Sequence, residues 1–570
     1  MKTILLFLLP FFLNVRSVNA QHAPAVSNVV FLTGNTADAE NTTNLTALHE
    51  ALLKETAPVI LIYNGDILHK KGIDGKASAK DSAFIRLLLD VVKDIPKASV
   101  YFTPGDLDWN NSGLNGWKAV KELEELVDGI AGKKVFLPES GCPGPVSIDL
   151  GENLAIALIS TQWWIHPHDR PHAPATACDV LVEQQFMEQL EDLLEENSEK
   201  NLLLVGHHPA ISNGRYGGKN AVAQHFAPPV IGTFKAGFHQ NIGDPKDISY
   251  PAYKALADNL KYLMEDHAPF IYASAHEYNL QLLEFENSYQ LVSGAIVKKV
   301  AAGKSENTVF NSGEQGFIKL SYYDDGKVMA DVVELSDGKI LATESKELYQ
   351  SSCNPDPSGA PLNTSFVPCR EKIFPAEHMN PAFADSIGTA AGGAKYKAGA
   401  IKKAFLGSLY RSSWTAPIQT GYLNLDTARG GLTAVGKGGG RQTHSLSLEG
   451  GDGKSYVFRS VDKDPIKALD PVLRKTFVLG LSRQATATQH PYGAIPVSYL
   501  LNTTSIFHAQ PSLYLLPDDP KLGMFQKEFG GMLGMLEEKP KKGKGKNKGS
   551  YGANDIVRSF DLFEKLYKDH

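Results

Sequence analysis

Short apolar runs alternate with amphipathic stretches over the first half of the chain, from Val29 to about Tyr323. Short buried strands that alternate with helices are typical of a layered α/β sheet. The predicted strands are Val29–Thr33, Val59–Asn64, Ser99–Thr103, Leu154–Ser160, Leu202–Val205 and Phe270–Ser274. The predicted helices are Leu45–Glu55, Ser82–Ile95, Trp117–Val127, Val180–Glu196 and Ala252–Asp266. Two later hairpins, Leu280–Phe285 with Gln290–Ser293 and Phe317–Asp325 with Lys327–Glu334, close this α/β domain.

The composition of the chain predicts three further regions around an α/β domain at residues 21–345. Residues 346–404 are rich in Pro, Gly and Ala and are predicted to form a linker. Residues 405–570 mix strand-like, glycine-rich and helical segments, which predicts a smaller α+β domain. Its basic run Lys539–Ser550 favours a solvated loop over a polyanion site. The predicted final helix Asp555–His570 ends without a cap, as expected for the front part of a longer protein.

Residues 1–20 have the pattern of a secretory signal peptide rather than of a buried N-terminal helix. Lys2 precedes the apolar run Ile4–Leu13, and the small-residue site Val18–Ala20 precedes Gln21. No later run reaches the length of a transmembrane helix. We therefore expect a protein that is exported to the periplasm, to the cell surface, where it would be associated with the outer membrane, or to the medium.

Composition and cysteine number refine this expectation. The 570 residues are 42% hydrophobic and 21% charged, with 57 Lys and Arg against 63 Asp and Glu, a net charge of −6. These values indicate a globular protein and give no reason to expect nucleic acid as a partner. Export makes disulfides plausible, and four cysteines allow three pairings. We favour Cys142–Cys178 and Cys353–Cys369, because each pair closes a modest loop and neither has the spacing of a zinc knuckle.

Polar side chains follow five of the predicted strands. In an open α/β sheet, the carboxyl ends of the strands form the ligand crevice, and glycine there permits close backbone approach. Taken singly, each of these pairs is explained by a turn or a helix cap. Together, nitrogen and oxygen ligands at one crevice predict a site for Zn, Mn or Fe. The five strand ends are Gly34-Asn35, Gly65-Asp66, Gly105-Asp106, Gly206-His207-His208 and Ser274-Ala275-His276.

The same residues resemble, in order, the motif blocks of the calcineurin-like metallophosphoesterases, nearest the purple acid phosphatase-like, exported bacterial type. The resemblance covers about 300 residues and implies a four-layer α/β/β/α sandwich with two metal ions, a phosphate-ester substrate and an activated water. It implies the ligands Asn35, Asp66, His69, Asp106, His207, His276 and Tyr278, with Asp66 bridging.

This sequence departs from the family pattern at several of these positions. Asn35 stands where the family has Asp, Asp106 where it has Asn, His69 where it has Tyr, and Tyr278 where it has His. The seven positions hold the same residue types as those of the family, namely two Asp, one Asn, three His and one Tyr, in a different order. Two interpretations remain open, a rearranged site that binds metal and a decayed site that does not.

Leu107 replaces the histidine that the resemblance implies as general acid, and leucine cannot donate a proton. Loss of a general acid typically slows a reaction by about 10²–10⁴. His208 is the candidate substitute, although a histidine before Pro209 is equally explained by a turn. We expect a preference for activated esters such as aryl phosphates.

A second candidate site lies in the C-terminal region, where a glycine-rich loop joins two predicted strands. Backbone N–H groups at Gly438, Gly439 and Gly440, with Arg459 on a following strand, form a weak candidate phosphate site. The region distantly resembles the front lobe of an atypical kinase, but no catalytic-loop or metal-binding triplet follows it. A flexible hairpin is the simpler interpretation.

Three functions therefore remain: an exported metal-dependent phosphoesterase, an inactive pseudophosphatase that acts as a cell-surface binding or scaffold protein, and a nucleotide-binding protein related to kinases. We favour the first. The loops expected to cover the site, His166–Ala177 and Asn213–Asp247, carry no specificity motif. His166, His168 and His172 in the first loop favour an exposed segment over a metal site.

Overall fold

The computed structural model describes most of the chain, including both parts that the sequence predicts. The described residues are 24–37, 42–68, 73, 77–151, 153–172, 178–198, 200–217, 244–267, 269–351, 376–438, 442–469, 476–540 and 549–553. The predicted signal peptide, His69, Cys353, Cys369, Gly439 and Gly440 lie outside these residues.

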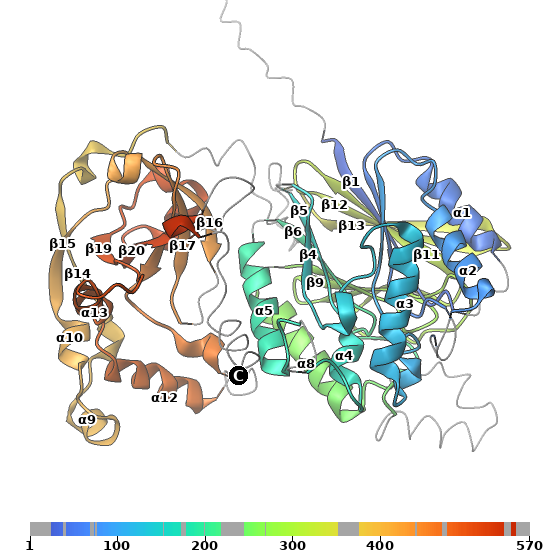
Figure 1. Ribbon diagram of the computed structural model, residues 1–570, viewed down its shortest axis with the longest axis horizontal. Helices are drawn as coiled ribbons and strands as arrows, with labels where there is room; N and C mark the ends of the chain where they lie inside the picture. The colour runs from blue at the N-terminus through green and yellow to red at the C-terminus, as the bar shows by residue number, and fades with distance from the viewer. Residues whose placement is uncertain are drawn as a thin grey trace, which may run out of the picture.

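Two mixed sheets form the first part of the protein (Figure 1). In the first, β1, β2 and β3 are parallel, and β11 continues the sheet antiparallel to β1. Its order is β13-β12-β11-β1-β2-β3. Its strands are β1 (Val26–Thr33), β2 (Val59–Tyr63), β3 (Ala98–Phe102), β11 (Gln315–Tyr323), β12 (Val328–Ser336) and β13 (Lys339–Tyr349).

The second sheet has parallel β5, β6, β7 and β9 at its centre and antiparallel strands at both edges. Its order is β10-β8-β9-β7-β6-β5-β4. Its strands are β4 (Val146–Asp149), β5 (Leu154–Leu158), β6 (Asn201–Val205), β7 (Ile271–Ser274), β8 (Leu280–Phe285), β9 (Ser288–Ser293) and β10 (Thr308–Ser312).

Helices cover the outer faces of both sheets, which gives the four-layer α/β/β/α sandwich (Figure 1). Alternate residues of β1 explain the layers: Val30 and Leu32 face the core between the sheets, whereas Val29 and Phe31 pack toward the helices. Strands buried on both faces read as continuous apolar runs, as the sequence showed. The helices are α1 (Thr43–Leu52), α2 (Ala79–Asp90), α3 (Gly116–Ala131), α4 (Thr161–Ile165), α5 (Glu183–Glu196) and α8 (Pro251–Asp266).

Local sequence sets the ends of several of these helices. Ser78 accepts a hydrogen bond from the N–H of Asp81 at 3.1 Å, and Asp81 accepts one from the N–H of Ser78 at 2.7 Å. This capping box fixes the start of α2. Gly132, with φ of 68°, ends α3 in the left-handed conformation that glycine adopts at no steric cost. The helix ends thereby fix where the chain enters and leaves the sheet.

The second part of the protein is built on an antiparallel five-stranded sheet in the order β16-β17-β18-β20-β19, beside the pair β14-β15. A smaller apolar core lies around Leu446, Phe458 and Leu536. Its strands are β14 (Ile387–Ala391), β15 (Pro417–Gly421), β16 (Leu432–Gly438), β17 (Ser445–Gly450), β18 (Ser455–Ser460), β19 (Ser512–Leu515) and β20 (Leu533–Lys539). Its helices are α9 (Ala400–Leu406), α10 (Arg411–Thr415), α12 (Phe477–Ala485), α13 (Ala494–Leu501) and α14 (Gln526–Phe529).

The structure moves both limits of the linker expected at residues 346–404. β13 continues to Tyr349 because it pairs along its whole length with β12. At the other limit, Met379 is buried in the apolar core of the second part and the N–H of Ala376 donates to the carbonyl oxygen of Pro520, so that the described residues from 376 onward belong to the second part. Strand pairing and burial set these boundaries, and local composition does not report either.

One predicted disulfide is confirmed, between Cys142 and Cys178, with Cα atoms 5.5 Å apart. The other predicted pair lies outside the described residues. Within the described ranges, no helix combines the length and apolar character needed to cross a membrane.

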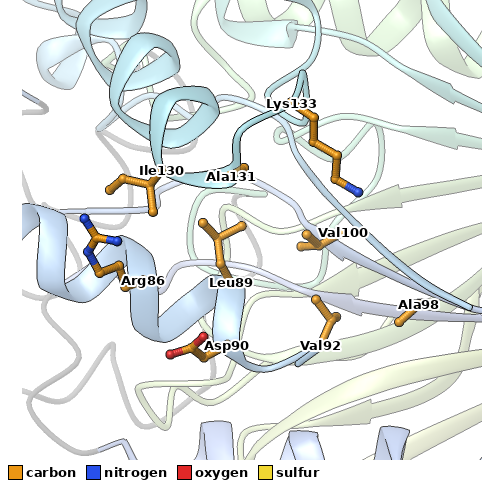
Figure 2. Close-up of a pocket in the computed structure, with 9 residues that line it drawn as sticks. All are labelled: Arg86, Leu89, Asp90, Val92, Ala98, Val100, Ile130, Ala131 and Lys133. Carbon is orange, nitrogen blue, oxygen red and sulfur yellow. The ribbon is translucent and has the colours of Figure 1, made fainter. Parts of the chain in front are cut away.

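A hollow of about 410 Å³ lies between α2, α3 and the start of the edge strand β3 (Figure 2). Apolar side chains such as Leu89, Val100 and Ile130 line it, with Arg86 and Lys133 at its margin. None of the polar residues that follow the strands lines this hollow. It is therefore separate from the candidate site.

Candidate metal centre

The carboxyl ends of strands from both sheets bring buried acidic and imidazole groups together. Asp66 and Asp106 follow β2 and β3 of the first sheet, and His207, His208 and His276 follow β6 and β7 of the second. Each of the five is at most 2% exposed. The two sheets thus contribute carboxylates from one side and imidazoles from the other.

Three of these side chains form a nearly equilateral triangle of donor atoms. His207 Nε2 lies 3.3 Å from Asp106 Oδ1, His276 Nδ1 lies 3.2 Å from the same oxygen, and the two ring nitrogens are 3.3 Å apart. Ligands about 2.1 Å from a tetrahedral zinc ion are about 3.4 Å from one another. The triangle therefore matches one face of such a coordination shell.

The opposite nitrogen of each of these two rings is held by a backbone carbonyl. His207 Nδ1 lies 2.6 Å from the carbonyl oxygen of Asn64, and His276 Nε2 lies 2.8 Å from that of Lys246. A carbonyl only accepts, so these nitrogens carry the hydrogens. In the neutral imidazoles, the lone pairs then point into the triangle. This arrangement is typical of histidine ligands of metals.

His208 differs from its two neighbours in its hydrogen bonding. A ring nitrogen of His208 lies within 4.8 Å of the donor atoms of Asp106, His207 and His276. Its Nδ1 is 2.9 Å from Thr161 Oγ1, and its buried Nε2 has no partner. Thr161 Oγ1 already accepts from the N–H groups of His207 and His208, so its own hydrogen is donated to Nδ1. Neutral His208 therefore carries its hydrogen on Nε2.

Lys246 supplies a positive charge at the edge of the triangle. Its Nζ lies 2.8 Å from Asp106 Oδ2, the carboxylate oxygen that does not face the imidazoles. Its side chain is 24% exposed, in contrast to the enclosed donors around it. Asp66 lies on another side, with Oδ1 3.5 Å from His207 Nε2 and bonded to the N–H of Leu107 at 2.9 Å.

Asp108 ties the two loops that carry the aspartates. Its carboxylate accepts hydrogen bonds from the N–H groups of Asp66, Ile67 and Gly105 at 2.8–2.9 Å. Gly105 must be glycine, because a Cβ atom there would meet both Asp66 and His207. These contacts hold the ends of β2 and β3 at the separation that the candidate ligands require.

Three of the polar residues after the strands have left-handed backbone conformations. The φ angles are 54° at Asn35, 56° at Asp66 and 58° at His276. Asn, Asp and His adopt this region more readily than other non-glycine residues, although at a cost in free energy. Strained backbone of this kind clusters at functional sites, which supports a function for this crevice.

Burial and neighbouring charges shift the pKa values of the cluster in opposite directions. Burial alone would lower the pKa of His207, but Asp66 and Asp106 raise it to about 9. Burial and the adjacent His276 and His207 hold the pKa of His208 well below its usual range. For Asp106, burial acts upward, but Lys246 and the two imidazoles bring the pKa well below its usual value.

The pKa values of Asp66 and Asp108 are raised. Burial and the charge of Asp106 raise the pKa of Asp66. Burial and the charge of Asp66 raise the pKa of Asp108 to about 7, although its backbone hydrogen bonds act against this shift. The cluster therefore concentrates negative charge that a cation would stabilise.

The remaining predicted ligands are placed differently. The amide Nδ2 of Asn35 donates to the carbonyl oxygens of Glu277 and Gly294 at 3.2 and 3.1 Å, while its buried Oδ1 has no partner. Oδ1 is therefore the one polar atom of the Asn35 side chain that is available as a metal ligand. The ring of Tyr278 contacts the ammonium of Lys298, 4.7 Å from the ring centre. His69 lies outside the described residues.

Sequence reasoning missed Lys246, Thr161 and Asp108. Lys246 lies in the loop Asn213–Asp247, in which no motif was recognised. The segment Gly105-Asp106-Leu107-Asp108 was the available signal for Asp108, and the segment Thr161-Gln-Trp-Trp164, which resembles the family's bacterial members, was the signal for Thr161. Nothing in the sequence singled out Lys246.

Two other sequence expectations concern residues away from the cluster. His166, expected in an exposed segment, is buried against Trp109, with ring centres 5.0 Å apart, and burial lowers its pKa to about 4. His168 and His172 are exposed, as expected. In the second part, Gly438 ends β16, and Arg459 Nε pairs with Glu537 Oε1 at 2.6 Å on an exposed face.

Comparison with known proteins gives distant structural likenesses. No family model matches the chain, and no curated protein matches it significantly. A structure titled GAP50, the anchor in the inner membrane complex of Plasmodium, is 16% identical, with a TM-score of 0.40, over 57% of this chain and 91% of that one.

Two phosphoesterase structures are similarly distant. Purple acid phosphatase PPD1 from yellow lupin (Lupinus luteus) is 13% identical, with a TM-score of 0.35, over 57% of this chain and 54% of that one. A putative 5′-nucleotidase from Staphylococcus aureus is 12% identical, with a TM-score of 0.29, over 57% of this chain and 55% of that one. The match spans about half the length of each of these two structures. At these sequence identities and TM-scores, the structural likenesses do not support an argument about function. That argument rests on the site itself.

Proposed function

We propose that the protein is an exported metal-dependent phosphoesterase with an altered centre built around one metal ion. The observation that carries this proposal is the triangle of Asp106 Oδ1, His207 Nε2 and His276 Nδ1, with both imidazoles oriented by backbone carbonyls. Three protein ligands that leave a further position open are typical of catalytic rather than structural zinc sites.

The chain's own residues fit such an ion. Asp106, His207 and His276 would hold it, and Asp66 lies beside His207 with Oδ1 3.5 Å from Nε2. A divalent ion supplies Lewis acidity toward phosphoryl oxygens and lowers the pKa of bound water. Zn, Mn and Fe all suit this mixed nitrogen and oxygen donor set.

His208 supports a role beside the ligands rather than among them. Its neutral Nε2–H is buried without a partner, so it provides a hydrogen-bond donor for a substrate oxygen. A neutral imidazole is a weak acid, and Leu107 provides no proton. The proposal therefore keeps the expectation that activated esters react fastest.

Export is the remaining part of the proposal. The Cys142–Cys178 disulfide supports an oxidising compartment, such as a periplasm, a cell surface or the medium. The signal-peptide pattern of residues 1–20 gives independent support from the sequence.

Elemental analysis of the mature protein, beginning at Gln21, combined with an aryl phosphate assay, tests the proposal. We expect one ion per chain after loading with Zn or Mn, at least tenfold lower occupancy in His276→Ala and Asp106→Ala, and metal-dependent hydrolysis. His172→Ala is the matched control, because His172 is exposed and its contacts, with Asp169, the carbonyl of Arg170 and the ring of Trp117, include no member of the donor triangle. Metal-free protein without hydrolysis would contradict the proposal.

That contradictory result would favour the pseudophosphatase, a binding or scaffold protein that keeps the fold. Two observations favour this alternative: the apolar Leu107 replaces the acid, and the amide of Asn35 is used to bind main-chain carbonyls.

A further inference from the structure

We propose that Lys246 is an oxyanion-binding residue of this centre, whose fixed ammonium supplies the positive charge that a second metal ion would otherwise bring. The ligand it recognises is a phosphoryl group. The choice of that ligand class rests on the proposed function, whereas the anion site itself rests on the contacts of Lys246.

Lys246 contacts both sides of the cluster. Its Nζ lies 2.8 Å from Asp106 Oδ2, and its carbonyl oxygen lies 2.8 Å from His276 Nε2. One residue therefore contacts a carboxylate from the first sheet and an imidazole from the second. This double attachment fixes the position of the ammonium relative to the candidate metal ligands.

The ammonium is placed to bind a further group. The Lys246 side chain is 24% exposed, whereas that of Asp106 is 2% exposed, so Lys246 lies where the crevice meets solvent. An ammonium group carries three N–H donors, and that of Lys246 forms an ion pair with Asp106 Oδ2. The ring of Tyr216 lies beside the site and contacts His276 in a tilted arrangement, with ring centres 4.6 Å apart.

Charge explains why the lysine is needed. One divalent ion between the carboxylates of Asp66 and Asp106 would be neutralised by them and would have little net attraction for an anion. The ammonium of Lys246 makes this group net positive. Asp108 is turned onto three backbone N–H groups and does not contact Lys246.

The same contact argues against a second ion beside Asp106. The ammonium pairs with Asp106 Oδ2, so that this oxygen is already taken by a cationic group. Asn35, which stands where the family has an aspartate, adds no negative charge to hold such an ion, and its amide is bound to carbonyls. The altered residues thus agree with a centre of one metal ion and one lysine.

Calorimetric titration with inorganic phosphate tests the inference in metal-loaded protein whose metal content is measured in the same sample. We expect the Kd for phosphate to rise at least tenfold in Lys246→Met, which keeps the length of the side chain and removes its charge. Lys246→Arg is expected to stay within a few-fold of the unchanged protein. Lys254→Met is the matched control, because Lys254 pairs with Asp258 on the exposed face of α8.

The outcomes separate this inference from the proposed function. An unchanged phosphate Kd in Lys246→Met, at full metal occupancy, would overturn the inference and leave the metal centre standing. The inference is also overturned if Lys246→Met loses metal while its loaded fraction binds phosphate normally, since Lys246 would then only position Asp106. If the protein holds no metal, phosphate binding that still depends on Lys246 supports the anion site while the proposed function fails.

Discussion

His276 and Lys246 are joined by a hydrogen bond of 2.8 Å from the imidazole Nε2 to the main-chain carbonyl. This bond leaves Nδ1 of His276 facing Asp106 Oδ1 at 3.2 Å, and the side chain of Lys246 pairs with the other oxygen of the same carboxylate. A loop residue outside every motif thereby orients a histidine of one sheet and neutralises an aspartate of the other. The donor triangle depends on this residue as much as on the strand ends.

The pKa of His207 predicts how the stability of the metal-free protein depends on pH. Its folded-state pKa is raised to about 9 from the usual 6.5 of a histidine, so its stabilising contribution is complete below pH 6.5 and is lost as the pH rises through 9. We expect the free energy of unfolding, measured with a chelator present, to fall by up to about 3 kcal/mol between pH 6.5 and 9.5. His207→Gln should remove most of this slope. Equal slopes in the two proteins would contradict the assignment.

Metal binding should show the opposite trend with pH. A proton on His207 competes with the ion for the same nitrogen, so the affinity for Zn should increase as the pH rises toward 9. Competition with a chromogenic chelator at several pH values measures this trend. An affinity independent of pH between 6.5 and 8.5 would argue that His207 is not a ligand.

The leucine at position 107 leads us to predict a preference for aryl over alkyl phosphates. Because leucine cannot protonate a leaving alcohol, the unchanged protein should hydrolyse aryl phosphates much faster than alkyl phosphates. Leu107→His should raise the ratio of alkyl to aryl turnover at least tenfold, with kcat/KM for both esters as the measurement. Leu107→Phe is the control for the change of volume at this buried position. Equal turnover of alkyl and aryl esters by the unchanged protein would contradict the missing acid.

The close contacts around Gly105 lead us to predict that the site does not tolerate a side chain at this position. A Cβ atom at this position would lie 2.8 Å from His207 Cε1 and also collide with Asp66. Gly105→Ala should therefore cost about 1–3 kcal/mol of stability and lower metal occupancy. Gly129→Ala is the matched control, since its Cβ on α3 meets no neighbour and should raise stability by up to about 1 kcal/mol. Full metal occupancy in Gly105→Ala would show that the crevice is more tolerant than its contacts indicate.

We expect the Cys142–Cys178 disulfide to raise the free energy of unfolding. It closes a loop with a sequence separation of 36 residues, so its removal should lower the free energy of unfolding by about 4 kcal/mol. Chemical denaturation of the double variant Cys142→Ala, Cys178→Ala measures this contribution. Metal content should be unchanged, because neither cysteine contacts the donor cluster. A midpoint equal to that of the unchanged protein would contradict the expectation.

The order of secondary structure and the position of the crevice could be read from the sequence because both depend on local patterns. The continuous apolar run of β2 predicted a strand buried on both faces, and the Gly-Asp that follows it predicted a turn at the carboxyl edge. The Cys142–Cys178 pairing followed from loop length. The direction of Tyr278 toward Lys298 and the burial of His166 against Trp109 could not be read in this way, since both depend on neighbours distant in sequence.

The sequence by itself determined that five polar strand ends would line one edge of an α/β sandwich, because strand alternation and parallel pairing are encoded in short apolar segments. Only the tertiary structure decided which atoms meet there. The proton position on His208 depends on a hydroxyl 47 residues away, and the charge beside Asp106 comes from Lys246, which lies in none of the motifs recognised in the sequence. Such contacts are set by packing between segments that share no local pattern, and so they have no counterpart in the sequence alone.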